Sequence, residues 1–148
     1  MTDSDYQIST DRDRIDVDLV FHFLSDESYW RRGIPRHIVE RSIENSLCFG
    51  VYSGDEQVGF ARVITDRATF ALIADVFIVA SHRGKGLSKR LMREVVNHPD
   101  LQGLSRMLLL TSDAHSLYEQ FGFVEIANSW RFMERLQTGG DQRCPRTS

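Results

Sequence analysis

Cysteine, proline and long apolar runs are scarce in this chain of 148 residues, which holds two cysteines and three prolines. Cys48 stands among apolar residues and Cys144 in a polar stretch, so the sequence offers neither a disulfide framework nor the ligand spacing of a zinc site. No apolar run approaches the roughly 20 residues of a membrane-spanning helix, and Met1–Asp13 is polar and acidic, unlike a secretory signal. We therefore expect a cytoplasmic protein without a membrane partner, a disulfide or a metal.

A strong excess of charge of one sign is also lacking. The net charge of −3 and the isoelectric point near 5.9 give no overall attraction to nucleic acids, so no nucleic-acid partner is expected. A content of 41% hydrophobic and 26% charged residues is typical of a soluble globular domain. We expect one domain over residues 1–136, because residues 137–148 have almost no apolar side chains and predict a mobile tail.

The first half of the chain predicts an antiparallel beginning. Alternating apolar residues predict a strand at 6–10 and a two-stranded hairpin at 47–52 and 57–65. Apolar residues at helical spacing predict one helix from Asp16 and another from Pro35. Turn residues at 53–56 join the two strands of the hairpin. We expect the strands of this half to pair antiparallel in one sheet and its helices to pack against that sheet.

The second half predicts a parallel pair. The run Thr69–Val79 is apolar except for Asp75 and is typical of a strand covered on both faces. An amphipathic helix ending at His98–Pro99 and a strand at Met107–Leu110 follow, which implies a parallel crossover. The predicted remainder is a helix from Ala114 ended by Gly122, and a last strand pair at Phe123–Ile126 and Trp130–Leu136. The fold class is α/β (α+β), a mostly antiparallel mixed sheet with a central parallel pair and about four flanking helices.

The most informative stretch is Arg83–Ser88 (RGKGLS), between the long apolar strand and the amphipathic helix. A helix N-terminus presents unpaired N–H groups and a partial positive charge, and Gly84 and Gly86 have no Cβ to keep an anion off the backbone. The order of strand, turn and helix therefore predicts a phosphate-binding cradle.

Two nucleotide-binding motifs fit this stretch poorly. A P-loop needs four residues between its first glycine and Gly-Lys-Ser/Thr, and the dinucleotide fingerprint needs a third glycine where this chain has Lys89. Both motifs normally follow a first strand, whereas this turn lies past mid-chain. A nucleotide-binding enzyme is therefore disfavoured.

A second motif, AHSLYEQFGF at residues 114–123, follows the glycine turn. The two motifs in this order resemble the GNAT superfamily of acetyl-CoA-dependent N-acetyltransferases. The turn is similar to that family's Arg/Gln-x-x-Gly-x-Gly/Ala pyrophosphate signature, with Ser88 in the last position, and the later stretch is similar to its A-x-x-L-Y-x-x-x-G-F helix. The resemblance covers roughly residues 5–136 and implies a parallel pair of strands splayed around the cofactor.

The resemblance implies acetyl-CoA as cosubstrate and no metal. Backbone groups of Val76, Phe77 and Ile78 would pair with the pantetheine arm. The other cofactor-binding residues that the resemblance implies are Arg83, Gly84, Lys85, Gly86, Leu87, Ser88, Lys89 and Thr111. The lysines either add charge near the phosphates or form a solvated helix face, and both interpretations stay open.

Two residues are candidates for the chemistry. Tyr118 matches the position of the tyrosine that protonates the leaving thiolate in the family, and a phenol of pKa near 10 is protonated at neutral pH. Asp75 is a base for an amine that arrives protonated, a paired structural group, or a residue on the solvent-exposed side of the sheet. Some members carry a glutamate on the strand that matches Arg106–Leu110, where this chain has no carboxylate, so that role is not carried over.

Tyr29 and Trp30 lie in the segment that builds the acceptor side of such folds, beside Arg31 and Arg32. They predict either an aromatic floor for a flat or anionic acceptor or an anchor for the two helices. The function that the resemblance implies is direct transfer of an acetyl group from acetyl-CoA to an amine of a small molecule or peptide. The alternative is a non-catalytic CoA-binding sensor or interaction module. Exposed strand edges make a homodimer reasonable.

Overall fold

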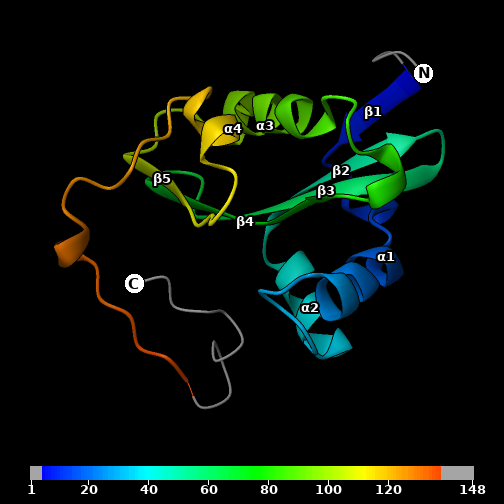
Figure 1. The fold of residues 1–148 in the computed structure, drawn as a ribbon, viewed down its shortest axis with the longest axis horizontal. Helices are drawn as coiled ribbons and strands as arrows, with labels where there is room; N and C mark the ends of the chain where they lie inside the picture. Colours follow the sequence, from blue (N-terminus) through cyan, green and yellow to red (C-terminus); the bar gives the residue numbers. More distant parts are fainter. Residues whose placement is uncertain (1–4, 138–148) are drawn as a thin grey trace.

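A five-stranded mixed sheet is the middle layer of the structure, a computed structural model that describes residues 5–137 (Figure 1). The strands lie side by side in chain order and are β1 (Tyr6–Ser9), β2 (Leu47–Ser53), β3 (Glu56–Thr65), β4 (Phe70–Ile78) and β5 (Arg106–Leu109). The first four pair antiparallel, and β4 and β5 pair parallel. The predicted mixed sheet with one parallel pair is therefore confirmed.

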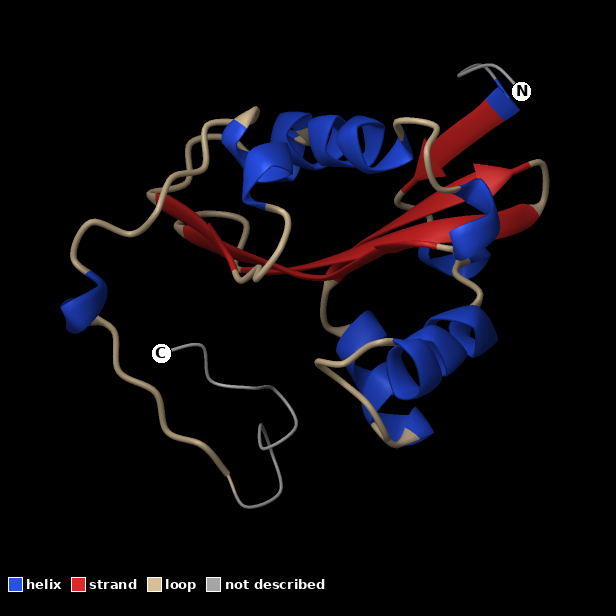
Figure 2. Ribbon diagram, viewed as in Figure 1, coloured by secondary structure: helices blue, strands red, loops and turns tan. Residues whose placement is uncertain are grey.

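Helices cover both faces of this sheet (Figure 2). On one face lie α1 (Val17–His22), which continues as a π-helical turn at Phe23–Glu27, and α2 (Arg36–Glu44). On the other face lie α3 (Leu87–Asn97) and α4 (His115–Glu119). Each face has its own cluster of buried apolar residues, as expected for strands covered on both sides.

Local sequence signals set the ends of these helices. The Asp16 side chain accepts a hydrogen bond from the Leu19 amide (3.1 Å) and caps α1. His98 and Pro99 follow the last residue of α3, because proline cannot continue a helix. Gly122, at φ +89°, lets the chain turn back after α4, where the Phe123 amide bonds to the Tyr118 carbonyl (3.3 Å). These predicted boundaries are confirmed.

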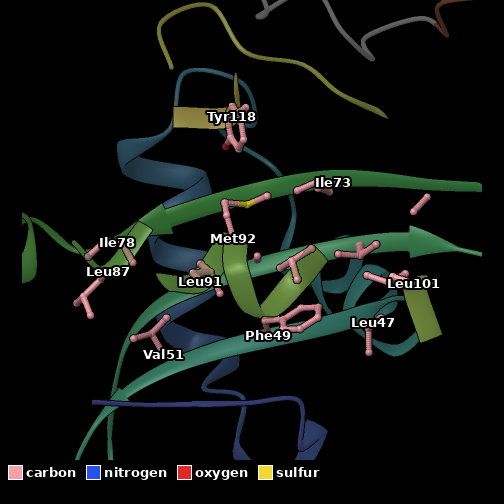
Figure 3. Packing of buried hydrophobic residues seen from close by; sticks show 14 of the residues in the cluster. Leu47, Phe49, Val51, Ile73, Ile78, Leu87, Leu91, Met92, Leu101 and Tyr118 are labelled. Carbon is pink, nitrogen blue, oxygen red and sulfur yellow. The ribbon is translucent and has the colours of Figure 1, made fainter. Parts of the chain in front are cut away.

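The helix α3 is held to the sheet by its apolar face. Leu87, Leu91, Met92 and Val95 are buried against Phe49 and other side chains of the sheet (Figure 3). Burial of each such side chain stabilises the fold by roughly 1.5–3 kcal/mol. This packing fixes the N-terminus of α3 relative to the end of β4.

The predicted strand pair at Phe123–Ile126 and Trp130–Leu136 is wrong. Neither segment pairs with β5, and Ser129–Arg131 forms a 3-10 turn instead. Val124, Trp130 and Met133 are 84%, 79% and 96% exposed. An alternating segment becomes a strand only when a neighbouring strand satisfies its backbone groups, and within residues 5–137 no strand lies beside this one.

Two sequence expectations concern the chain ends. The predicted tail lies, apart from Gln137, outside the described residues, as does Cys144. The single-domain boundary at residue 136 stays a prediction. Over residues 5–137, the structure has no helix long and apolar enough to span a membrane.

Candidate active site

The two parallel strands separate toward one end of the sheet. They pair only where Phe70–Ile73 runs beside Arg106–Leu109, and β4 then continues to Ile78 with no β5 residue opposite it. Backbone groups of Val76, Phe77 and Ile78 on that side therefore face a gap instead of a strand. The splay that the resemblance implied is present.

A bulge in β4 coincides with this separation. Phe60 pairs with Phe77 and Arg62 with Ala74, so β4 carries one residue more than β3 between these pairs. Asp75, at the bulge, has φ +53°, which costs a residue with a side chain of order 1–3 kcal/mol. The extra residue changes the direction of β4 near the point where its pairing with β5 ends.

The glycine turn forms an open cradle at the start of α3. Gly84 and Gly86 have φ of +80° and +76°, and a Cβ built on either would meet no protein atom within 4 Å. Backbone conformation, rather than crowding inside the protein, therefore requires glycine here, and the space above the amides is open. A cavity of about 260 Å³ lies over the turn, lined by Ile78, His82, Arg83, Gly84, Gly86, Leu87, Ser88, Lys89 and Leu117.

The basic residues of the turn differ in position. The Arg83 Nε donates to the carbonyl of Ile78 (2.9 Å), so this side chain ties the turn to the end of β4. Lys89 lines the cavity, whereas Lys85 is exposed outside that lining. Arg83 and Lys89 therefore both line the cavity over the turn, and Lys85 does not.

His82 is a cavity residue that the sequence reasoning passed over as a lone histidine. Its Nδ1 lies 2.8 Å from the Tyr6 hydroxyl, and the two rings meet edge to face. When the hydroxyl donates to Nδ1, the neutral ring carries its proton on Nε2. Because Tyr6 is 76 positions away in the chain, no local motif could have found this pair.

Tyr118 lies on the α3–α4 side of β4, in the cluster that contains Ile73 and Met92 (Figure 3). Its side chain is 8% exposed, and the residues described provide no hydrogen-bond partner for its hydroxyl. Burial, and next the charge of Asp113, raise the pKa of the phenol above its usual value. The hydroxyl therefore keeps its proton at neutral pH and is free to donate it.

The loop after β5 connects to the acceptor side. The Thr111 Oγ1 accepts from the Ala114 amide (3.0 Å), which orders the start of α4. Ser112 Oγ and the Tyr29 hydroxyl lie 2.8 Å apart, so the loop between α1 and α2 bridges to the loop between β5 and α4. Tyr29, which is 43% exposed, thus contacts the loop that follows β5.

Trp30 and Asp75 meet in a buried network on the α1–α2 side. Asp75 Oδ1 accepts from the Trp30 indole (3.0 Å), and Oδ2 accepts from the Arg62 Nε (2.8 Å). Arg62 also donates to Ser46 (3.2 Å), and the Arg31 Nε is 4.0 Å from Asp75. The Asp75 side chain is only 3% exposed, so its charge depends on these partners.

Replacing Arg62 by methionine is expected to lower the free energy of unfolding by about 3–5 kcal/mol, because the buried Asp75 carboxylate would lose its closest partner. The matched control is Arg36→Met, which removes an exposed ion pair with Asp18 and should cost at most about 1 kcal/mol. Chemical denaturation measures both values. An equal loss of unfolding free energy in the two variants would mean that the buried ion pair stabilises the fold no more than the exposed one.

Cys48 is not a nucleophile in this fold. It is 4% exposed, and burial raises the pKa of its thiol to about 11, against a smaller opposite effect of Arg62. In a Cys144→Ser background, we expect the folded protein to take up no maleimide at pH 7 and to react once after unfolding. Labelling of the folded protein at the rate of a free thiol would contradict this assignment.

The described part of the chain contains no group of three or more His, Cys, Asp or Glu side chains that could hold a metal ion.

The order of these elements matches a known family. A model of the acetyltransferase (GNAT) domain matches residues 44–125, from the end of α2 past the end of α4. The chain belongs to the GNAT family. The match spans both motifs, the glycine cradle and the Tyr118 helix, so the resemblance seen in the sequence is confirmed.

Several proteins are similar to this GNAT chain. A proposed acetyltransferase of Gibberella zeae is 34% identical over 139 residues, which cover 79% of this chain and 77% of that protein. A crystal structure of a proposed GNAT acetyltransferase from Xanthomonas campestris is 48% identical with a TM-score of 0.88, and the match covers 90% of this chain and 94% of the other. A crystal structure of a proposed acetyltransferase from Clostridium acetobutylicum, described with acetyl-CoA, shares 18% identity and a TM-score of 0.63 over 88% of this chain and 94% of the other.

Proposed function

We propose that this GNAT acetyltransferase moves an acetyl group from acetyl-CoA to the amine of a small molecule or peptide. The observation that carries the proposal is the open glycine cradle at the N-terminus of α3, beside the end of β4 that no longer pairs with β5. The similar fold described with acetyl-CoA supports the choice of cosubstrate.

The cofactor-binding part of the proposal follows the geometry. Amides from Gly84 to Lys89 would bind the pyrophosphate, and the unpaired side of Val76–Ile78 would hydrogen-bond to the pantetheine arm. Lys89 would add a point charge at the cavity, and Lys85 a weaker one from outside it. Thr111, through its bond to Ala114, would hold the strand end and α4 around the thioester.

Tyr118 is the proposed proton donor. The neutral amine attacks the acetyl carbon, the carbon–nitrogen bond forms, the carbon–sulfur bond breaks, and the thiolate takes the phenolic proton. The nitrogen, which carries an extra proton after the attack, releases that proton to water. A phenol whose pKa is raised holds this proton until the thiolate forms, and water or buffer then restores it. The hydroxyl is available because no protein group described uses it.

Asp75 is proposed to hold the acceptor-binding residue Trp30 in position through their hydrogen bond. Its role as a base stays a prediction. Both of its oxygens already accept hydrogen bonds, from Trp30 and from Arg62. It would take a proton from an amine only where the amine, or a water, replaces the Trp30 contact. An Asp75→Asn variant that shifts the acidic limb of the pH profile would support the base role, and a change only in the acceptor KM would support positioning.

Tyr29 and Trp30 are the proposed acceptor-binding residues. Their rings meet edge to face with centroids 5.1 Å apart, and Arg31 lies beside them. A flat or anionic amine would stack on this pair and meet a positive charge. Trp30→Phe keeps the ring but loses the bond to Asp75, so it should raise the acceptor KM.

The test is a panel of amines incubated with acetyl-CoA and the protein, read as release of free thiol. Release that depends on one class of amine would support the enzyme and identify the acceptor. Tight acetyl-CoA binding without release for small amines, amino sugars, peptides and lysine side chains would favour the sensor alternative, which the absence of a carboxylate on β5 also suggests.

A further inference from the structure

His82 stands in the wall of the cavity over the glycine turn, directly before the first residue of that turn. It ends the short 3-10 helix Ala80–His82, which joins β4 to the turn. The basic side chains Arg83 and Lys89 line the same cavity, and no aspartate or glutamate is among the described residues around it. The cavity therefore favours an anion, and the His82 imidazole is a further group able to bind one.

One nitrogen of the His82 ring is already used within the protein. Its Nδ1 lies 2.8 Å from the Tyr6 hydroxyl, and the two rings meet edge to face with centroids 5.7 Å apart. When the hydroxyl donates to Nδ1, a neutral ring keeps its proton on Nε2, and a charged ring carries a proton there as well. In the described part of the chain, no protein group bonds to Nε2. The ring therefore has one N–H left to donate.

Tyr6 can hold this ring because Tyr6 is itself held in place. Its side chain is 4% exposed, and β1 pairs Tyr6 with Ser53 of β2. The Tyr6 carbonyl accepts a hydrogen bond from Arg90 Nη2 of α3 (2.8 Å), so β1 is joined to the helix whose N-terminus forms the cradle (Figure 1). A side chain that is already held loses less conformational freedom when a ligand binds. The His82 ring is therefore positioned before the ligand arrives.

We propose that His82 donates its Nε2–H to a phosphate oxygen of the CoA bound in the cradle, and that Tyr6 is the positioning residue that keeps the proton on this nitrogen. This assignment rests on the proposed function, which supplies the cofactor. The glycine turn would bind phosphate through backbone N–H groups, and His82 would add a side-chain donor from the residue before the turn. CoA carries a pyrophosphate and a 3′-phosphate, and both offer the same acceptor chemistry.

The first test is isothermal titration of acetyl-CoA into His82 variants. His82→Ala should raise the Kd about 10-fold, because a hydrogen bond to a charged group is lost. His82→Gln, whose side-chain amide can also donate, should recover most of the affinity. The matched control is His22→Ala, at a histidine on α1 whose side chain is 64% exposed and which lies outside the cavity lining.

The outcomes separate this assignment from the proposed function. Equal Kd values for the wild type and His82→Ala, with both proteins folded by melting temperature, would overturn the role of His82 alone. A folded wild type that binds no acetyl-CoA would overturn the proposed function and the role of His82 with it.

A second titration identifies the phosphate that His82 contacts. The same variants are titrated with acetyl-dephospho-CoA, which lacks the 3′-phosphate. An effect of His82→Ala that persists with this ligand assigns the contact to the pyrophosphate, and an effect that disappears assigns it to the 3′-phosphate. Either result supports a phosphate contact.

The third test examines Tyr6 through the protonation of the His82 ring. Long-range ¹H–¹⁵N spectra at alkaline pH, with the His82 signals assigned from their loss in His82→Gln, should show the proton on Nε2 and a shift of this nitrogen when acetyl-CoA is added. Tyr6→Phe should give a mixture of the two neutral forms and raise the Kd about 3-fold. Tyr52→Phe, at a hydroxyl without a hydrogen-bond partner in the described part of the chain, is the control and should change neither. A wild-type ring protonated on Nδ1 alone would overturn the proposal.

Discussion

A Gly86→Glu variant is expected to lose acetyl-CoA binding. Its Kd should rise at least about 100-fold, which corresponds to about 2.8 kcal/mol of binding free energy. Gly86 caps α3 at φ +76°, so a side chain there is strained and extends into the open space of the cradle. The carboxylate would occupy the anion site and repel the pyrophosphate. Isothermal titration of acetyl-CoA measures the change.

Gly103→Glu is the matched control for this experiment. Gly103 also has a left-handed φ, +72°, and a Cβ there would meet nothing within 4 Å, but it lies after α3, outside the lining of the cradle. Both variants carry similar backbone strain, so a difference in Kd isolates the cradle. Undiminished binding by Gly86→Glu would remove the glycine turn from the cofactor site.

The second large effect is expected for Tyr118→Phe. Loss of a general acid typically lowers kcat by 10²–10⁴-fold, and we expect a fall of about this size with the acetyl-CoA Kd unchanged. The ring remains to fill its place beside Phe123, so the melting temperature should hardly move. Tyr52→Phe, at a buried tyrosine whose hydroxyl has no hydrogen-bond partner in the described part of the chain, controls for the loss of a phenol outside the proposed site.

The pH profile gives an independent check on Tyr118. Its pKa is raised, so the protonated, active form persists to higher pH, and the alkaline loss of kcat should fall above the ordinary tyrosine value of about 10. Asp113→Asn removes one cause of the raised pKa and should move this limb to lower pH. An unchanged kcat in Tyr118→Phe would assign the proton to another donor.

Most of the fold was predictable from the sequence. The run Thr69–Val79 and the period of residues 87–97 contain enough apolar positions to define a buried strand and an amphipathic helix without help from the rest of the chain. Asp16, Pro99 and Gly122 mark helix ends through their own backbone and side-chain chemistry. The last strand pair failed because alternation at 130–136 shows that a strand is possible, not which strand it pairs with.

The site was predictable only in part. The glycine cradle is local, because the φ values and the helix N-terminus come from consecutive residues. The pairs Tyr6 with His82, Tyr29 with Ser112, and Trp30 with Asp75 join positions far apart in the chain. No local pattern in the sequence shows that residues so far apart in the chain come into contact.

The sequence by itself determined the order of strands and helices as far as α4, the conformation of the glycine turn and the family to which the chain belongs, because each depends on neighbouring residues or on a spaced motif. Only the tertiary structure decided that Asp75 is paired on both oxygens with Trp30 and Arg62, and that no strand within residues 5–137 pairs with the outer edge of β5. Burial, ion pairing and strand pairing are set by how distant segments pack in space.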